Sequence, residues 1–207
     1  MLPIIYSLID NAEYSRTGNE GDKGTSRLAI KILLLSLSML FGASLAGYFW
    51  VRGPVVIHWK PADMPTMPFG LWYSTCIVIC ISFSFESAIL FLKKGKAHAF
   101  QYNLFGIAIL AFSFLTAQFF NWKEMSDKNM LPTTQNLYSF TFYFLTTLHA
   151  VHVVGGILVF PKILIRALSM RYAAGNYGEI RNFAYYWHFL GAVWIVLFFI
   201  FRFFSAS

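Results

Sequence analysis

The chain has little charge for its length, and this scarcity limits what kind of protein it can be. Charged residues make up 12% of its 207 residues, whereas hydrophobic residues make up 57% and phenylalanine alone occurs 23 times. A typical soluble domain devotes about 25% of its residues to charge in order to solvate its surface. The composition therefore excludes an ordinary soluble protein and indicates helices that lie in a membrane.

Cysteine is also scarce, and its spacing argues against a metal or disulfide framework. The two cysteines, Cys76 and Cys80, are one helical turn apart within an apolar run. A structural metal site needs more ligands at suitable spacing, and no further cysteine is present to supply them. We therefore expect both thiols to pack against lipid or protein.

The net charge of +7 raises the question of a nucleic-acid partner. The basic residues, however, gather at the ends of apolar segments instead of forming a patch or stripe. Basic residues in that position set the direction in which a chain crosses a membrane. We therefore predict no nucleic-acid partner.

Five apolar segments are long enough to cross a hydrocarbon layer of about 30 Å at about 1.5 Å per helical residue. They are residues 28–50, 69–92, 99–122, 138–165 and 182–204. Residues 1–27 are mostly polar and rich in glycine, and we expect them to form an exposed N-terminal tail. The sequence thus predicts an all-α integral membrane bundle of five transmembrane helices.

The basic residues are divided unevenly between the two sides of such a bundle. Eleven fall on the side of the N-terminus, namely Arg16, Lys23, Arg27, Lys31, Lys93, Lys94, Lys96, Lys162, Arg166, Arg171 and Arg181. Five fall on the other side, namely Arg52, Lys60, Lys123, Lys128 and Arg202. Because cytoplasmic loops carry the excess of lysine and arginine, this places the N-terminus in the cytoplasm and the C-terminus in the periplasm.

Ionisable side chains inside the spans gather at one depth. His149 and His152 share a helical face with Gly156, and His188 shares a face with Gly191 on the last span. Glu86, on the second span, falls at a similar distance from the cytoplasmic side. Polar groups at membrane depth are costly and need partners. The sequence therefore predicts a buried polar cluster of Glu86, His149, His152 and His188.

Several functions would use such a cluster. Two histidines on facing helices, such as His152 and His188, could hold a haem, and Glu86 with the histidines could relay protons. Alternatively, the histidines fix the packing of the helices or contact a lipid head group. A di-iron site needs about four carboxylates, and the spans contain one, so that site is excluded. A transporter would show inverted repeats and broken helices, which the sequence lacks.

Two motifs carry a resemblance to a known family. Residues 148–156 read Leu-His-Ala-Val-His-Val-Val-Gly-Gly, and residues 186–189 read Tyr-Trp-His-Phe, followed by Val193 and Trp194. They resemble the His-x-x-His-Val-x-x-Gly and Tyr-Trp-His-Phe-Val-Asp-Val-Val-Trp segments of subunit III of haem–copper terminal oxidases. Residues 114–122 and residues 47–50 are similar to two further helix ends of that family.

The resemblance implies the five-helix form of subunit III, in a bacterial plasma membrane. It implies a non-catalytic role: packing against oxidase subunit I near the point where its protons enter, and holding phospholipid. Haem and copper would lie in partner subunits I and II, in a complex that reduces O2 to water and pumps protons. The electron donor would be cytochrome c or quinol, and a larger respiratory supercomplex is a further possible partner. The rival is a haem-binding cytochrome b-type membrane anchor of a dehydrogenase.

The chain departs from the family pattern at two positions. The family's membrane-embedded glutamate has no counterpart in residues 36–41, which read Ser-Leu-Ser-Met-Leu-Phe, and Gly191 stands where the family has aspartate. We hypothesise that Glu86 replaces the lost carboxylate. Arg166 and Arg181, near the cytoplasmic helix ends, are candidates for contact with lipid phosphates. Alternatively, these two arginines only help to set the direction in which the chain crosses the membrane.

Overall fold

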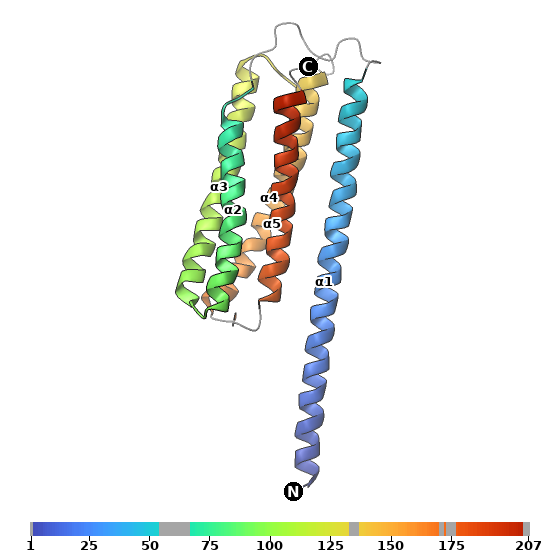
Figure 1. The fold of residues 1–207 in the computed structure, drawn as a ribbon, viewed down its shortest axis with the longest axis vertical. Coiled ribbons are helices and arrows are strands. Elements are labelled where there is room, and N and C mark those ends of the chain that lie inside the picture. The colour runs from blue at the N-terminus through green and yellow to red at the C-terminus, as the bar shows by residue number, and fades with distance from the viewer. Residues whose placement is uncertain (1, 54–66, 133–136, 170–171, 173–176, 205–207) are drawn as a thin grey trace. The chain divides into compact units, whose positions relative to one another are not determined.

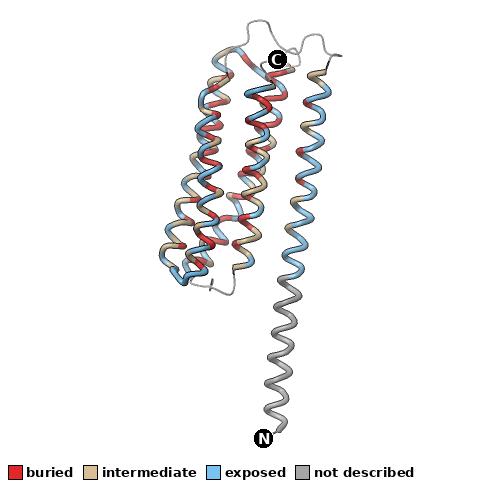
Figure 2. Tube along the Cα trace, viewed as in Figure 1, coloured by how far each residue is buried: buried red, intermediate tan, exposed pale blue. Residues whose placement is uncertain are grey.

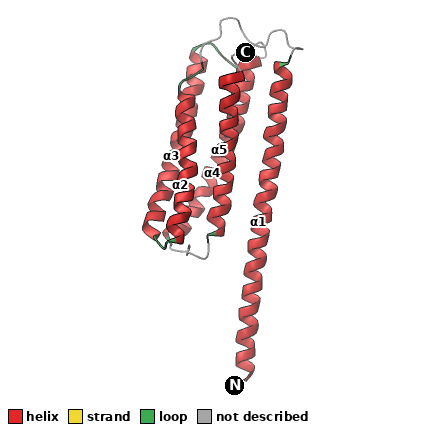
Figure 3. Ribbon diagram, in the orientation of Figure 1, coloured by secondary structure: helices red, strands yellow, loops and turns green. Residues whose placement is uncertain are grey.

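A computed structural model describes residues 2–53, 67–132, 137–169, 172 and 177–204, and for residues 2–23 and 204 it describes the backbone alone. All regular structure in these ranges is helical (Figure 3). The elements, in chain order, are α1 (Leu2–Arg52), α2 (Gly70–Lys93), α3 (Ala97–Asp127), α4 (Leu137–Leu168), α5 (Gly178–Phe199) and the short π-helix η1 (Ile200–Phe204) (Figure 1).

The five predicted spans are confirmed. Each is part of a helix long and apolar enough to cross a membrane, with bounds Gly24–Arg52, Gly70–Lys93, Ala97–Asp127, Leu137–Leu168 and Gly178–Phe203. The direction in which they cross stays a prediction. Lys60 and Arg171, which entered the charge count, lie outside the described residues.

The first helix is longer than its apolar part. The backbone of α1 is already helical at Leu2 and continues without a break to Arg52. The helix therefore includes the residues that we expected to form a polar tail, and the division of the chain into tail and bundle stays a prediction. Pro54 comes two residues after Arg52, and proline disfavours the helical conformation of the residue before it, so the sequence favours an end of α1 at this point.

The chain forms two compact units, residues 1–38 and residues 39–207. In the second unit, α2 to α5 run side by side as a closed arrangement (Figure 1). Helix α2 packs against α3 and α5, and α4 packs against the same two helices. A tight turn joins α2 to α3, with Gly95 at a φ of 68°, a conformation that favours glycine. We call this end of the bundle the turn end.

The core of the second unit lies among the four helices α2, α3, α4 and α5. Buried positions recur along each of these helices (Figure 2). Its largest fully buried side chains are aromatic. Trp194 of α5 meets Phe114 of α3 edge to face, with ring centroids 4.9 Å apart, and Phe142 of α4 meets Phe201 of η1 at 5.0 Å. Such edge-to-face pairs add to the stability that their buried area provides. Cys76 and Cys80 are free and exposed, and their packing against lipid or protein stays a prediction.

Glycine at position 156 allows α5 to approach α4 closely. A Cβ atom added there would lie 3.0 Å from Cε1 of Tyr186 and 3.1 Å from Cζ2 of Trp187. Its neighbour Gly155 faces more open space, since a Cβ atom there would meet only the Tyr186 hydroxyl, at 3.7 Å. Small residues serve this purpose in membranes, where no hydrophobic force draws helices together.

We expect Gly156→Ala to destabilise the bundle by about 1–3 kcal/mol, the usual cost of overpacking, and Gly155→Ala to be close to neutral. Thermal unfolding of both variants in the same detergent checks this difference. Equal midpoints for the two variants would show that the contact between α4 and α5 at Gly156 is not tight.

Candidate functional site

The structure brings together two of the four predicted cluster residues. Nε2 of His188 on α5 lies 3.1 Å from Oε1 of Glu86 on α2, so the imidazole can donate a hydrogen bond to the ionised carboxylate. The pair lies about two helical turns before α2 ends at Lys93. Its side chains are not buried in this chain: Glu86 is 58% exposed and His188 is 30% exposed.

The expectation that Glu86 is buried is therefore not met in the isolated chain. The helix explains why, because the preceding residue, Phe85, points into the core and is fully buried. Successive residues of a helix point about 100° apart. Glu86 consequently projects from the side of α2, where it reaches α5 only through His188.

His149 is the one fully buried histidine of the described residues. Its Nε2 lies 3.0 Å from the backbone carbonyl oxygen of Leu190 on α5. A carbonyl oxygen only accepts, so Nε2 carries the proton and donates. The ring packs between Trp194 and Phe114, at centroid distances of 5.2 and 5.6 Å. His149 thus ties α4 to α5 in the middle of the core.

His152 has a different partner again. Its Nδ1 lies 2.7 Å from the carbonyl oxygen of Leu148 in its own helix. The ring lies 5.3 Å from that of Phe41 on α1, and the hydroxyl of Tyr186 donates to the backbone carbonyl oxygen of His152 at 2.7 Å. The four predicted residues therefore form a surface pair and two separately bonded histidines instead of one cluster.

A second polar layer, which we did not predict, joins the helices toward the opposite end of the bundle. Side chains of α2 bond to α3 and α5: Gln118 donates to Ser74 at 2.9 Å, and Trp194 donates to Thr75 at 3.1 Å. Trp122 of α3 donates to Thr146 of α4 at 3.0 Å. The signal would have been serine, threonine and tryptophan that recur within several spans.

Gly191 shows why the aspartate of the resembling motif does not fit here. A Cβ atom at this position would lie 3.1 Å from Cγ1 of Val78 and 3.4 Å from Oγ of Ser82, both on α2. A carboxylate would have no room between these helices. A carboxylate does lie beside α5 nearby, that of Glu86, one turn along α2 from Ser82 and 3.1 Å from Nε2 of His188.

The two arginines that we considered for lipid contact differ in their surroundings. Nη1 of Arg166 lies 2.6 Å from Oε2 of Glu179, which also accepts a 2.8 Å hydrogen bond from Tyr172. Burial, with the hydrogen bond to Glu179 and its negative charge, raises the pKa of the Tyr172 phenol, so it remains a donor at neutral pH. Arg181 instead lies with Lys93 against the ring of Tyr177, at 5.6 and 5.3 Å. Contact of either arginine with lipid stays a prediction.

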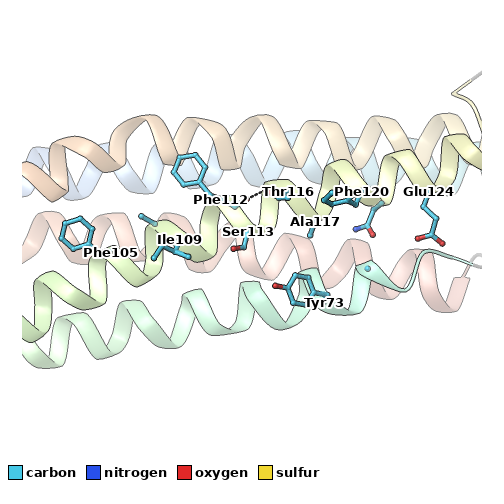
Figure 4. Close-up of a pocket in the computed structure, with 12 residues that line it drawn as sticks. Tyr73, Phe105, Ile109, Phe112, Ser113, Thr116, Ala117, Phe120 and Glu124 are labelled. Carbon is cyan, nitrogen blue, oxygen red and sulfur yellow. Dashed lines mark hydrogen bonds between the residues drawn. The ribbon is translucent and has the colours of Figure 1, made fainter.

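A groove of about 800 Å³ runs along the outer side of α3, beside the start of α2 (Figure 4). Aromatic side chains border it, including Tyr73, Phe105, Phe112 and Phe120. Small side chains, Ala108, Ser113 and Ala117, widen it along its length. Polar groups lie at one end, where Oε1 of Glu124 is 2.7 Å from Nζ of Lys128.

Among the residues whose side chains are described, no group of three or more histidine, cysteine, aspartate or glutamate side chains could hold a metal ion. The three imidazoles bond three different partners: His149 bonds the carbonyl of Leu190, His152 the carbonyl of Leu148, and His188 the carboxylate of Glu86. The chemistry that this arrangement offers is hydrogen bonding between helices and, at Glu86 and His188, a polar contact open to the surroundings.

Comparison with known proteins places the chain among similar sequences. The family model described as "Cytochrome c oxidase subunit III" matches residues 8–206. A probable cytochrome c oxidase subunit 3 of Mycobacterium tuberculosis is 27% identical over 81% of this chain and 82% of its own length. Cytochrome c oxidase subunit 3 of Thermostichus vulcanus is 26% identical over 83% of each chain, and that of Corynebacterium diphtheriae is 28% identical over 81% and 82%.

We expect His149→Ala to lower the free energy of unfolding by about 2 kcal/mol or more, because it removes a buried hydrogen bond and leaves a cavity. His152→Ala should cost less, since its side chain is half-buried and bonded within its own helix. Denaturation in mixed detergent micelles checks the order. A larger loss for His152→Ala would contradict the assignment of His149 as the tie between α4 and α5.

Proposed function

The chain belongs to the cytochrome c oxidase subunit III family, and we propose that it acts in that oxidase as a non-catalytic subunit that stabilises subunit I and holds phospholipid. As a member of this family it is a multi-pass membrane subunit of an oxidoreductase complex, which implies further oxidase subunits as partners. Haem and copper then lie in subunits I and II, which carry out the reduction of O2 to water and the pumping of protons.

The placement of the histidines is the observation that carries the non-catalytic role. Haem ligation would need two imidazoles whose free nitrogens face each other across a gap between helices. Here His152, one of the two histidines considered for haem, bonds the carbonyl of Leu148 in its own helix, and the other, His188, is directed to Glu86. His149 is directed to the carbonyl of Leu190 in a closely packed core. The residues present are thus suited to packing. The alternative, a cytochrome b-type anchor of a dehydrogenase, gains no support from the relatives.

The groove along α3 supports the holding of lipid. Its apolar length between Phe105 and Phe120 covers about 22 Å of helix, comparable to an extended acyl chain. At its polar end, Glu124 and Lys128 present one negative and one positive charge. A zwitterionic phospholipid carries a complementary pair, with its amine directed to Glu124 and its phosphate to Lys128.

The direction of the chain is part of the proposal. Eleven of the sixteen basic residues fall on the side of the N-terminus and the turn end. This excess supports a cytoplasmic N-terminus and a periplasmic C-terminus in a bacterial plasma membrane. The Glu86–His188 pair then lies in the cytoplasmic half of the membrane, on the side from which the neighbouring subunit takes up protons.

We expect an affinity-tagged copy of this chain, purified from its native membrane in mild detergent, to bring down larger subunits together with a haem spectrum. Mass spectrometry of the eluate identifies the subunits, and an optical spectrum detects the haem. The same membrane carrying an untagged chain is the control. Elution of the chain without any haem-containing subunit would contradict the proposed role.

We expect Ser113→Phe, which fills the groove, to reduce the number of phospholipids that remain bound in native mass spectrometry. Thr147→Phe adds the same ring at an exposed position of α4 outside the groove and serves as the matched control. Equal lipid retention in both variants would show that the groove is not a lipid site.

A further inference from the structure

The Glu86–His188 pair lies in the middle of an exposed strip on α2 and α5. On α2, the residues that share this side are exposed and apolar, namely Trp72, Ile79, Phe83 and Leu90. On α5, Tyr185, Ala192 and Phe199 follow the same helical spacing beside His188. Trp72 and Phe198 pack edge to face at 4.8 Å, which keeps the two helices adjacent along the strip. We call these residues, with Glu86 and His188, the α2/α5 face.

Hydrocarbon cannot satisfy the polar groups on this face. Glu86 lies seven residues before the end of α2, about 10 Å along the helix, and its side chain is 58% exposed. Oε1 faces His188, but Oε2 has no hydrogen-bond partner among the described residues. A carboxylate at membrane depth normally faces the protein interior or a partner, because leaving it in lipid costs several kcal/mol.

The outer side of α3 differs from the α2/α5 face in the position of its carboxylate along the helix. Its exposed residues within the membrane, such as Phe105 and Phe112, are mostly apolar, and the exposed hydroxyl of Thr116 donates to the carbonyl of Phe112 in its own helix. Its carboxylate, Glu124, lies at the end of the groove. Lipid matches that arrangement, with hydrocarbon along the helix and charge at the interface. It does not match the α2/α5 face, where the carboxylate lies between apolar residues on both sides along the helix.

We infer that the α2/α5 face is the surface on which this subunit docks to another subunit of the oxidase, through a transmembrane helix that presents a hydrogen-bond donor to Oε2 of Glu86. The inference rests on the proposed function, which supplies a partner protein in the same membrane. A donor from serine, threonine, asparagine, lysine or arginine fits the free carboxylate oxygen, and apolar side chains of the same helix cover Phe83 and Leu90. His188 holds the carboxylate in place for this contact.

Site-specific photo-crosslinking in the intact complex tests the inference. Phe83 is replaced in one variant, and Phe112 in another, by p-benzoylphenylalanine; both native residues are exposed phenylalanines inside the membrane. We expect the probe at position 83 to crosslink to another oxidase subunit and the probe at position 112 to crosslink to lipid. A crosslink to a subunit from position 112, with only lipid or this chain's own α1 captured from position 83, would overturn the inference.

Substitution of the carboxylate gives a second measurement. We expect Glu86→Leu to weaken retention of the subunit in the complex by about 3-fold to 10-fold in a detergent titration, the range of a hydrogen bond between membrane helices. Glu86→Gln, which keeps an accepting oxygen, should retain the subunit better. Asp127→Asn, at an exposed position of α3 outside the groove, is the control and should leave retention unchanged. Equal retention of all three variants would refute docking through Glu86.

The outcomes separate the two proposals. If the tagged chain brings down the haem-containing subunits but the crosslinks arise only from position 112, the proposed function stands and the docking face is wrong. If no oxidase subunit is recovered with any variant, both proposals fail.

Discussion

Hydrogen bonding in the absence of water is the constraint on which this structure depends. Inside a membrane, each backbone and side-chain polar group must find its partner within protein, because hydrocarbon offers none. In this chain, side chains of one helix bond another: His149 bonds the carbonyl of Leu190, Tyr186 bonds the carbonyl of His152, and Trp122 bonds Thr146. These bonds lie at several depths, so the second unit is held together along its length.

Such bonds require helices that approach closely, and glycine allows this because it has no side chain to separate the backbones. Gly156 lets the rings of Tyr186 and Trp187 lie against the backbone of α4, and Gly191 does the same for Val78 of α2. Gly70 leaves room for the amide of Asn121, which would otherwise collide with its Cβ atom. The same closeness removes the space that an aspartate at position 191 would need. A single packing requirement therefore accounts both for the hydrogen bonds and for the departure from the family motif.

The sequence was sufficient for the number of candidate spans, because each is a long apolar run with few charges. It also placed Glu86 and His188 at a similar depth, in one predicted cluster with His149 and His152, of which the structure brings only Glu86 and His188 together. It was not sufficient to show that Glu86 is exposed, because one residue's shift around a helix, from Phe85 to Glu86, separates core from surface. The layer of Ser74, Thr75 and Gln118 was missed because uncharged polar residues attract little notice in an apolar run, although they bond the helices more extensively than the histidines do.

Removal of this subunit from the purified oxidase, followed by absorption spectra of both fractions, tests most directly whether its histidines serve packing and not redox chemistry. We expect the haem bands and most of the oxygen-reducing activity to stay with the remaining subunits, and the released chain to absorb only as its tryptophan and tyrosine do. A Soret band in the released chain that is lost on His152→Ala or His188→Ala would contradict a non-catalytic role and would make these histidines haem ligands.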